Sequence, residues 1–199
     1  LNPVRGNATT VTAVPKDGYE FEGWYLGNDE VGSTAEFKPD RPSTGWSEVT
    51  YTAKFTEKKV TIRYEATTGG TVTSASEEID AATGKPNGST ARPNEGYAFD
   101  KWTTDREGNN TLSLYNTFVP TKADGTVWTD GTTYYAQFKK VASVIKYRSE
   151  NADYGLVNGL AMTQETVYVA DSEAVKGATA TAKAGYEFIG WYLEGSDTP

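Results

Sequence analysis

The chain has 199 residues, a formal net charge of −8, 13% aromatic residues, no Cys and no His. The aromatic content excludes a disordered chain, and the acidic balance argues against nucleic acid as a partner because phosphates would be repelled. Without Cys or His the chain lacks disulfides, the commonest transition-metal ligand and the usual base of a serine-type triad. No apolar run predicts a membrane span or a signal peptide, so we interpret the sequence as a mature or excised fragment.

The first predicted strand is an aromatic segment that the chain repeats. GYEFEGWYL at 18–26 recurs loosely as GYAFDKWTT at 96–104 and closely as GYEFIGWYL at 185–193. A Gly that can adopt positive φ precedes each strand, and Pro in the first two copies presets φ for a type I turn. The predicted turns are Pro15-Lys16-Asp17-Gly18, Pro93-Asn94-Glu95-Gly96 and Ala182-Lys183-Ala184-Gly185.

The spacing of aromatic residues in this segment leaves two geometries open. In a flat strand Tyr19 and Phe21 face one side and Trp24 the other, so either a bulge near Gly23 turns the indole round or the sheet is covered on both faces. Lys101 replaces that Gly in the second copy, so a bulge that requires Gly is not available to all copies. Both geometries bury the indole. The predicted repeat core is Tyr19, Phe21, Trp24, Tyr97, Phe99, Trp102, Tyr186, Phe188 and Trp191.

Other segments also predict strands, and they recur in the same order. Apolar residues alternate with polar ones in Tyr51–Phe55 and Val60–Tyr64, a pattern typical of a strand with one buried face. Trp46 before the former is echoed by Trp128 before Tyr134–Phe138, and Val60–Tyr64 is echoed by Ser143–Tyr147. No long segment has helical periodicity. The best candidate for a short helix is Thr111–Thr117, where leucines and a tyrosine cluster.

The recurrences predict three small modules in tandem. The first spans 1–57 and lacks its first strands, the second spans 58–140 and is complete, and the third spans 141–199 and lacks its last strands. The joins between them contain no Gly, Ser or Pro linker, so they resemble turns within a module. A permuted frame of 1–86 and 87–171 therefore stays open.

The shared motifs carry a resemblance to a known family. G-Y-x-F-x-x-W, G-x-T-A-x-P at 88–93, an upstream V-T-I-x-Y…G-G-T-V and a closing Y-x-A-x-F together resemble the internalin B-type B-repeat, also called the Listeria–Bacteroides repeat. The family usually closes on a Trp, where this chain has Phe55 and Phe138, so this is a divergent member. The resemblance implies a mainly β, β-grasp-like fold with α+β at most, tandem modules in bacterial surface proteins, no catalysis and no cofactor.

This resemblance favours a non-catalytic spacer or stalk of a bacterial cell-surface or cell-wall protein, with a possible adhesive role. The expected partner is a protein or glycan on a host or neighbouring cell, bound through the loops between Leu26 and Trp46 or between Thr103 and Trp128, where the copies differ most. Neither nucleic acid nor membrane insertion is expected. The incomplete first and third modules could also pair with each other between molecules, head to tail.

Two rival functions remain. Trp46 and Trp128 lie beside polar sequence and are weak candidates for stacking platforms in a carbohydrate-binding module. The chain could instead be an accessory module of a larger secreted enzyme. The acidic loops Asn28–Glu30 and Asp105–Asn110 could hold Ca²⁺, but neither has EF-hand spacing, and solvated turns are the preferred interpretation.

Overall fold

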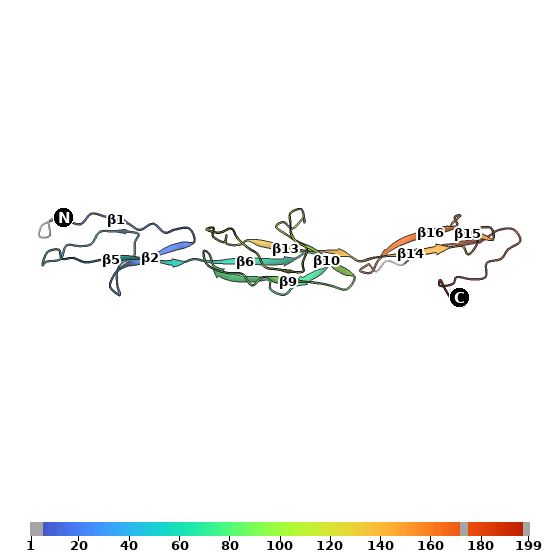
Figure 1. The fold of residues 1–199 in the computed structure, drawn as a ribbon, viewed down its shortest axis with the longest axis horizontal. Coiled ribbons are helices and arrows are strands. Elements are labelled where there is room, and N and C mark those ends of the chain that lie inside the picture. The colour runs from blue at the N-terminus through green and yellow to red at the C-terminus, as the bar shows by residue number, and fades with distance from the viewer. Residues whose placement is uncertain (1–5, 172–174, 197–199) are drawn as a thin grey trace.

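All of the regular secondary structure is β-sheet. The computed structural model describes residues 6–171 and 175–196, and within these residues it has strands β1 to β17 and no helix. Three small modules follow one another along the long axis of the molecule (Figure 1). We call residues 1–57, 58–140 and 141–199 repeats 1, 2 and 3. The prediction of small all-β modules in tandem is confirmed.

Repeat 2 contains two sheets. The larger has the order β11 (Thr111–Ser113), β10 (Tyr97–Thr103), β13 (Thr133–Lys140), β6 (Lys59–Ala66) and β8 (Ser76–Asp80). The smaller has the order β12 (Thr117–Phe118), β9 (Ser89–Pro93) and β7 (Gly70–Val72). All neighbours are antiparallel except β13 and β6, which run parallel. The larger sheet therefore consists of two antiparallel parts, β11–β10–β13 and β6–β8, which are joined by the parallel pairing of β13 with β6.

Alternation in the sequence explains which face of β6 is buried. Val60, Ile62 and Tyr64 are at most 6% exposed, whereas the intervening Thr61 and Arg63 reach solvent to a greater extent. Successive side chains of a strand point to opposite faces, so these three apolar residues all enter the core. The predicted strand with one buried face is confirmed.

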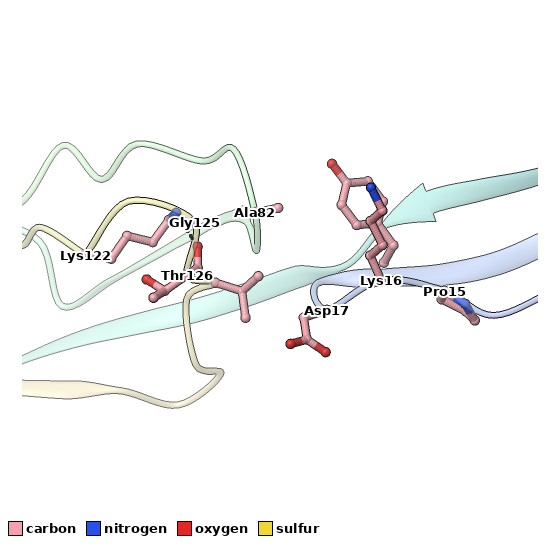
Figure 2. A pocket seen from close by; sticks show the side chains of 9 residues that line it. Pro15, Lys16, Asp17, Ala82, Lys122, Gly125 and Thr126 are labelled. Carbon is pink, nitrogen blue, oxygen red and sulfur yellow. Dashed lines mark hydrogen bonds between the residues drawn. The ribbon is translucent and has the colours of Figure 1, made fainter.

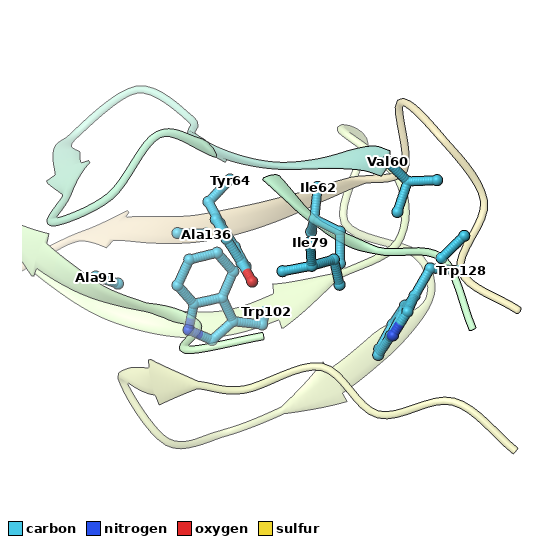
Figure 3. Packing of buried hydrophobic residues seen from close by; sticks show 9 residues of the cluster. Val60, Ile62, Tyr64, Ile79, Ala91, Trp102, Trp128 and Ala136 are labelled. Atoms are coloured by element: carbon cyan, nitrogen blue, oxygen red, sulfur yellow. The ribbon is translucent and has the colours of Figure 1, made fainter. Parts of the chain in front are cut away.

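The core of repeat 2 is built around one indole. Trp102 is 0% exposed, stacks on Phe118 at 5.6 Å and meets the edge of Tyr64 at 6.1 Å. Figure 3 shows this indole beside Tyr64, with Ile62 and Ile79 further along and Trp128 at one side. The buried cluster is Val60, Ile62, Tyr64, Ile79, Ala81, Ala91, Trp102, Trp128 and Ala136.

The turn before the aromatic strand lies one residue later than predicted. In repeat 1 the amide of Tyr19 donates to the carbonyl of Lys16 at 3.0 Å, so the hydrogen-bonded turn spans Lys16 to Tyr19 and leaves Pro15 outside it. The other repeats have the same bond, between Tyr97 and Asn94 and between Tyr186 and Lys183. Gly is needed because it adopts a φ of +76° to +88° in these turns.

A β-bulge resolves the orientation of the indole. Opposite β5 (Tyr51–Glu57), the register of β2 (Tyr19–Leu26) shifts between Phe21 and Gly23, so Glu22 is the extra residue. Strand β10 has the same shift across Asp100. Neither bulge needs Gly, because Gly23 does not adopt positive φ and Lys101 occupies its place in repeat 2. The bulge brings Phe21 and Trp24 together at 6.2 Å.

The predicted short helix at Thr111–Thr117 is wrong. This segment holds the short strands β11 and β12, joined by a bend at Leu114–Asn116. Leu114 and Tyr115 are 73% and 81% exposed, so the apolar residues that suggested a helix do not form a buried face. Strand β11 forms a hairpin with the preceding strand β10, and β12 pairs with the more distant β9; this strand pairing outweighs any local helical preference.

Repeats 1 and 3 contain different parts of the same plan. Repeat 1 has a sheet of β3 (Asp29–Gly32), β2 and β5, and a pair of β1 (Val11–Thr12) and β4 (Glu36–Phe37). Repeat 3 pairs β14 (Ala142–Arg148) with β16 (Met162–Tyr168), and β15 (Gly155–Val157) with β17 (Ala180–Ala182). By sequence and pairing, β5 corresponds to β13 and β14 corresponds to β6.

Candidate functional site

The joins between repeats are hydrogen-bonded to both sides. At the first join the amide of Lys58 donates to the carbonyl of Gly18 in repeat 1, and its carbonyl accepts from the amide of Ala81 in repeat 2, both at 2.8 Å. At the second join Val141 does the same with Gly96 at 2.8 Å and Val169 at 3.1 Å. At each join a single residue is thus hydrogen-bonded on both sides. Such a join resists bending more than a linker without these bonds.

Side chains add to each join in different ways. The carboxylate of Glu57 accepts the amides of Ala82 and Thr83 at 2.6 Å and the Thr83 hydroxyl at 3.0 Å. At the second join Lys140 forms an ion pair with Asp171. Sequence reasoning proposed both joins and noted that neither has a flexible linker, but it missed their shared hydrogen bonds because these use backbone groups.

An open pocket of about 520 Å³ lies at the first join (Figure 2). One wall is the turn of repeat 1 and the other is a loop of repeat 2. Its lining residues are Pro15, Lys16, Asp17, Tyr19, Ala82, Lys122, Gly125, Thr126 and Val127. Lys16 and Asp17 are exposed and Lys122 is half-exposed, so the pocket offers no desolvated charge with which to hold a small ligand.

The two proposed platform tryptophans direct their N–H groups inward. Trp128 is 8% exposed and its Nε1 donates to the carbonyl of Gly84 at 2.9 Å. Trp46 is half-buried and its Nε1 donates to the carbonyl of Gly6 at 2.6 Å. The same bond in both repeats ties the segment before the closing strand to an earlier part of the repeat. Burial of Trp128 leaves little of its ring open for stacking on a sugar.

The nine predicted core aromatics differ in burial between repeats. Trp24 and Trp102 are 9% and 0% exposed, and their Nε1 atoms donate to the carbonyls of Ala35 and Asn116 at 3.2 and 3.0 Å. In repeat 3 the corresponding segment is not in a strand, and its aromatics are 42% to 51% exposed. The half-buried ones are Tyr19, Phe21, Tyr97 and Phe99, and the exposed ones are Tyr186, Phe188 and Trp191.

A Tyr–Glu pair closes a loop in repeats 2 and 3. The hydroxyl of Tyr64 donates to Glu77 at 2.5 Å, and Glu77 also accepts the amides of Asn87 and Gly88 at 2.7 and 3.1 Å. In repeat 3, Tyr147 and Glu165 form the same pair, and Glu165 accepts two loop amides. Sequence reasoning missed this pair, although a Tyr and a later Glu do recur in both copies.

The hydrogen bonds of the pair shift the pKa of its members. Partial burial by itself would raise the pKa of Glu77, but the Tyr64 hydroxyl and the amides of Asn87 and Gly88 together lower it below the ordinary 4.5. Burial and the Glu77 carboxylate raise the pKa of Tyr64, so its hydroxyl stays protonated and keeps donating. The Tyr64–Glu77 pair thus holds the loop closed. Neither group has a feature of a catalytic acid or base.

We expect acid to weaken repeat 2 through Glu77. Because its folded pKa is below its unfolded value, its contribution is complete above pH 4.5 and is lost as the pH falls through the lowered pKa. Urea unfolding across this range should show Glu77→Gln to be less pH-dependent than the parent. Tyr64→Phe should cost about 1 kcal/mol at neutral pH. An identical pH dependence in Glu77→Gln and the parent would contradict this role.

The loop between Thr103 and Trp128, one of the two loops that differ most between the copies, contains two adjacent exposed apolar residues. Leu114 and Tyr115 occupy the positions of Ser33 and Thr34 of repeat 1, since Asn116 and Ala35 accept the equivalent indole bonds. A nearby loop is closed by Asp105, whose carboxylate accepts the amides of Asn109 and Asn110 at 2.9 and 2.8 Å. These bonds lower the pKa of Asp105 and hold the loop closed.

The fold and these contacts define the class of protein: a tandem array of small β-repeats. Across the described ranges 6–171 and 175–196, no group of three or more Asp or Glu is placed to hold a metal ion. In the same residues no helix has the length and hydropathy to cross a membrane.

Comparison with family models identifies these repeats. The divergent InlB B-repeat domain matches residues 2–59 and 60–142, and the Listeria-Bacteroides repeat domain matches residues 152–198. The chain belongs to the divergent InlB B-repeat family, whose repeats are typical of bacterial surface proteins and typically non-catalytic. No catalytic domain was identified in the chain. No solved structure matches it.

Proposed function

We propose that the chain is a non-catalytic spacer of an extracellular bacterial protein, held at the cell surface or cell wall, that sets the distance and orientation of an adhesive contact. The observation that carries this function is the repeated join, in which Lys58 and Val141 each donate to the preceding repeat and accept from a later residue of their own repeat. A flexible tether needs no such bonds. A spacer does, because bending at each join would shorten its reach.

The arrangement of the repeats supports this role. They lie end to end, with repeats 1 and 3 on either side of repeat 2 (Figure 1). A module of this size has a radius of gyration of about 12 Å, so each one adds roughly 30 Å of reach. Reach therefore grows with the number of repeats, while the repeated join keeps the direction.

The adhesive contact is proposed at the loop tip of repeat 2. Leu114 and Tyr115 are 73% and 81% exposed and are adjacent in the bend between β11 and β12. Contiguous exposed apolar surface marks binding sites more often than single exposed residues do, and Tyr is common at binding hot spots. The partner would be a protein or glycan on a host or neighbouring cell.

Distance measurements between repeats 1 and 3 test the spacer. The chain has no Cys, so Cys introduced at the exposed Lys38 and Lys183 would be the only attachment points for spin labels. Pulsed electron resonance should give one narrow distance distribution, because both joins are bonded on each side. A broad distribution reaching to short distances would show independent modules and contradict the spacer function.

A further inference from the structure

An exposed turn of repeat 3 has an unusual backbone conformation. Asn158 and Gly159 lie between Val157 and Leu160, whose backbone groups bond to each other at 2.7 and 2.9 Å. Both turn residues have positive φ, +50° and +78°, and in the described part of the chain Asn158 is the one residue other than Gly with this property. These angles are typical of a type I′ hairpin turn, for which Asn-Gly is a preferred sequence.

The same position in repeat 2 has different residues and one more hydrogen bond. Thr73 corresponds to Asn158, because the amide of each donates to the carbonyl of a facing threonine, at 3.0 and 2.8 Å. The next residue, Ser74, donates its amide to the hydroxyl of the buried Ser89 at 3.0 Å. Thr73 and Asn158 are both exposed, so exposure of this position is also a property of the complete repeat.

In repeat 3 the amide of Gly159 lacks the corresponding acceptor. Ala178 precedes the facing Thr179 where Ser89 precedes the facing threonine of repeat 2, so no hydroxyl is present. Within residues 6–171 and 175–196 the Gly159 amide donates to no group. The side chain of Asn158 is held in place, since its Oδ1 accepts the amide of Thr179 at 2.8 Å. A free amide therefore follows an oriented side-chain amide in an exposed turn.

We propose that Asn158 is a site of spontaneous modification, where water converts the side-chain amide to an acid without an enzyme. The Gly159 amide loses its proton to hydroxide, and its nitrogen attacks Cγ of Asn158. The new N–Cγ bond closes a succinimide ring, the Cγ–Nδ2 bond breaks, and Nδ2 takes a proton from water and leaves as ammonia. A second water then opens the ring at either carbonyl, which gives aspartate or isoaspartate.

The residues that suit the turn also make it reactive. Gly159 has no Cβ to hinder closure of the ring. The amide of Thr179 lies 2.8 Å from Oδ1 of Asn158, where negative charge develops as the nitrogen attacks, and a donor already in place stabilises that charge. Both products add a negative charge, and isoaspartate also lengthens the main chain of the turn by one atom. This modification goes beyond the spacer function and does not depend on it.

The other Asn-Gly pair of the chain provides an internal comparison. Asn87 is exposed, and Gly88 after it has a φ of +82°. Here, however, the Gly88 amide donates to the carboxylate of Glu77 at 3.1 Å. A bond to a charged acceptor is stronger than one between neutral groups, and it must break before the nitrogen can attack. We therefore expect Asn87 to react about tenfold more slowly than Asn158 in the folded chain.

Peptide mapping by mass spectrometry tests this assignment. The folded chain is incubated at mildly alkaline pH, and the acid forms at Asn158 and Asn87 are quantified in the same digest against an unincubated sample. Asn158 should convert about tenfold faster than Asn87. In urea the bond to Glu77 is absent, so the two positions should convert at similar rates.

A substitution that restores the missing acceptor tests the role of the free amide. Ala178→Ser supplies the hydroxyl that repeat 2 has at this position, so conversion at Asn158 should slow several-fold while conversion at Asn87 stays unchanged. Circular dichroism checks that the variant folds, and Asn158→Gln should show no conversion at this position. The proposal would be overturned by equal rates at Asn158 and Asn87 in the folded chain, by conversion of Asn158 only in urea, or by the parent rate in folded Ala178→Ser.

Discussion

Replacing Trp102 by Ala should destabilise repeat 2 by about 3–5 kcal/mol. The indole is 0% exposed, contacts Phe118 and Tyr64, and donates to the carbonyl of Asn116. Its removal leaves a cavity between the two sheets and removes one of the two hydrogen bonds that the Asn116 carbonyl accepts, the other coming from the Ala91 amide. Since small domains unfold with about 5–15 kcal/mol, this loss is a large share of the total. Urea unfolding followed by far-ultraviolet circular dichroism should show the transition at much lower urea.

The matched control is the same substitution in repeat 3. Trp191 occupies the same motif position but is 42% exposed, and its ring neighbours are Tyr147 at 5.9 Å and Phe188 at 5.7 Å. Trp191→Ala should therefore cost about 1 kcal/mol or less, close to the range of surface substitutions. Equal losses for Trp102→Ala and Trp191→Ala would mean that the two indoles have equivalent surroundings, contrary to the structure.

The fold class follows from the sequence because its signals are local. Alternation in Val60–Tyr64 fixes the buried face of β6, and Gly18, Gly96 and Gly185 all adopt the positive φ that the turns require. The predicted turn position is wrong by one residue. Pro15 suits the first central position of a type I turn, but the hydrogen bond that closes the turn leaves Pro15 outside it. At Thr111–Thr117 the clustered apolar residues suggest a helix, but pairing of β11 with β10 and of β12 with β9 decides the structure.

The candidate site is less accessible to sequence reasoning because it depends on distant pairs. Sequence variation between the copies points to the loop between Thr103 and Trp128, yet the exposure of Leu114 and Tyr115 depends on how β11 and β12 bend. The bonds at Lys58 use only backbone groups, which carry no residue signature. The sequence alone does not show the geometry of the bulge either. Gly23 suggests that the bulge requires a Gly, but Gly23 does not adopt the positive φ for which a Gly would be needed.

Replacing Gly96 by Ala should loosen the second join. Gly96 has a φ of +76°, and a Cβ there would lie 2.5 Å from the amide nitrogen and 2.7 Å from the Cα of Ala170 in repeat 3. These atoms are backbone, so relieving the clash requires the backbone of repeat 3 at Ala170 to move away from Gly96. That movement would break the bond from the Val141 amide to the Gly96 carbonyl. The label distance distribution between repeats 1 and 3 should broaden toward shorter values.

Gly185→Ala provides the control for backbone strain. Gly185 has a φ of +88° in the same turn of repeat 3, but, apart from its chain neighbours, no heavy atom of the described residues lies within 4 Å of its Cβ position. In both variants, an Ala held in the left-handed conformation should reduce stability by about 1 kcal/mol. Only Gly96→Ala also forces repeats apart. Broadening in Gly96→Ala alone identifies contact between repeats as the source of rigidity. Unchanged distances in Gly96→Ala would show that the side chains at the join, such as the pair of Lys140 and Asp171, hold the repeats without the backbone bond.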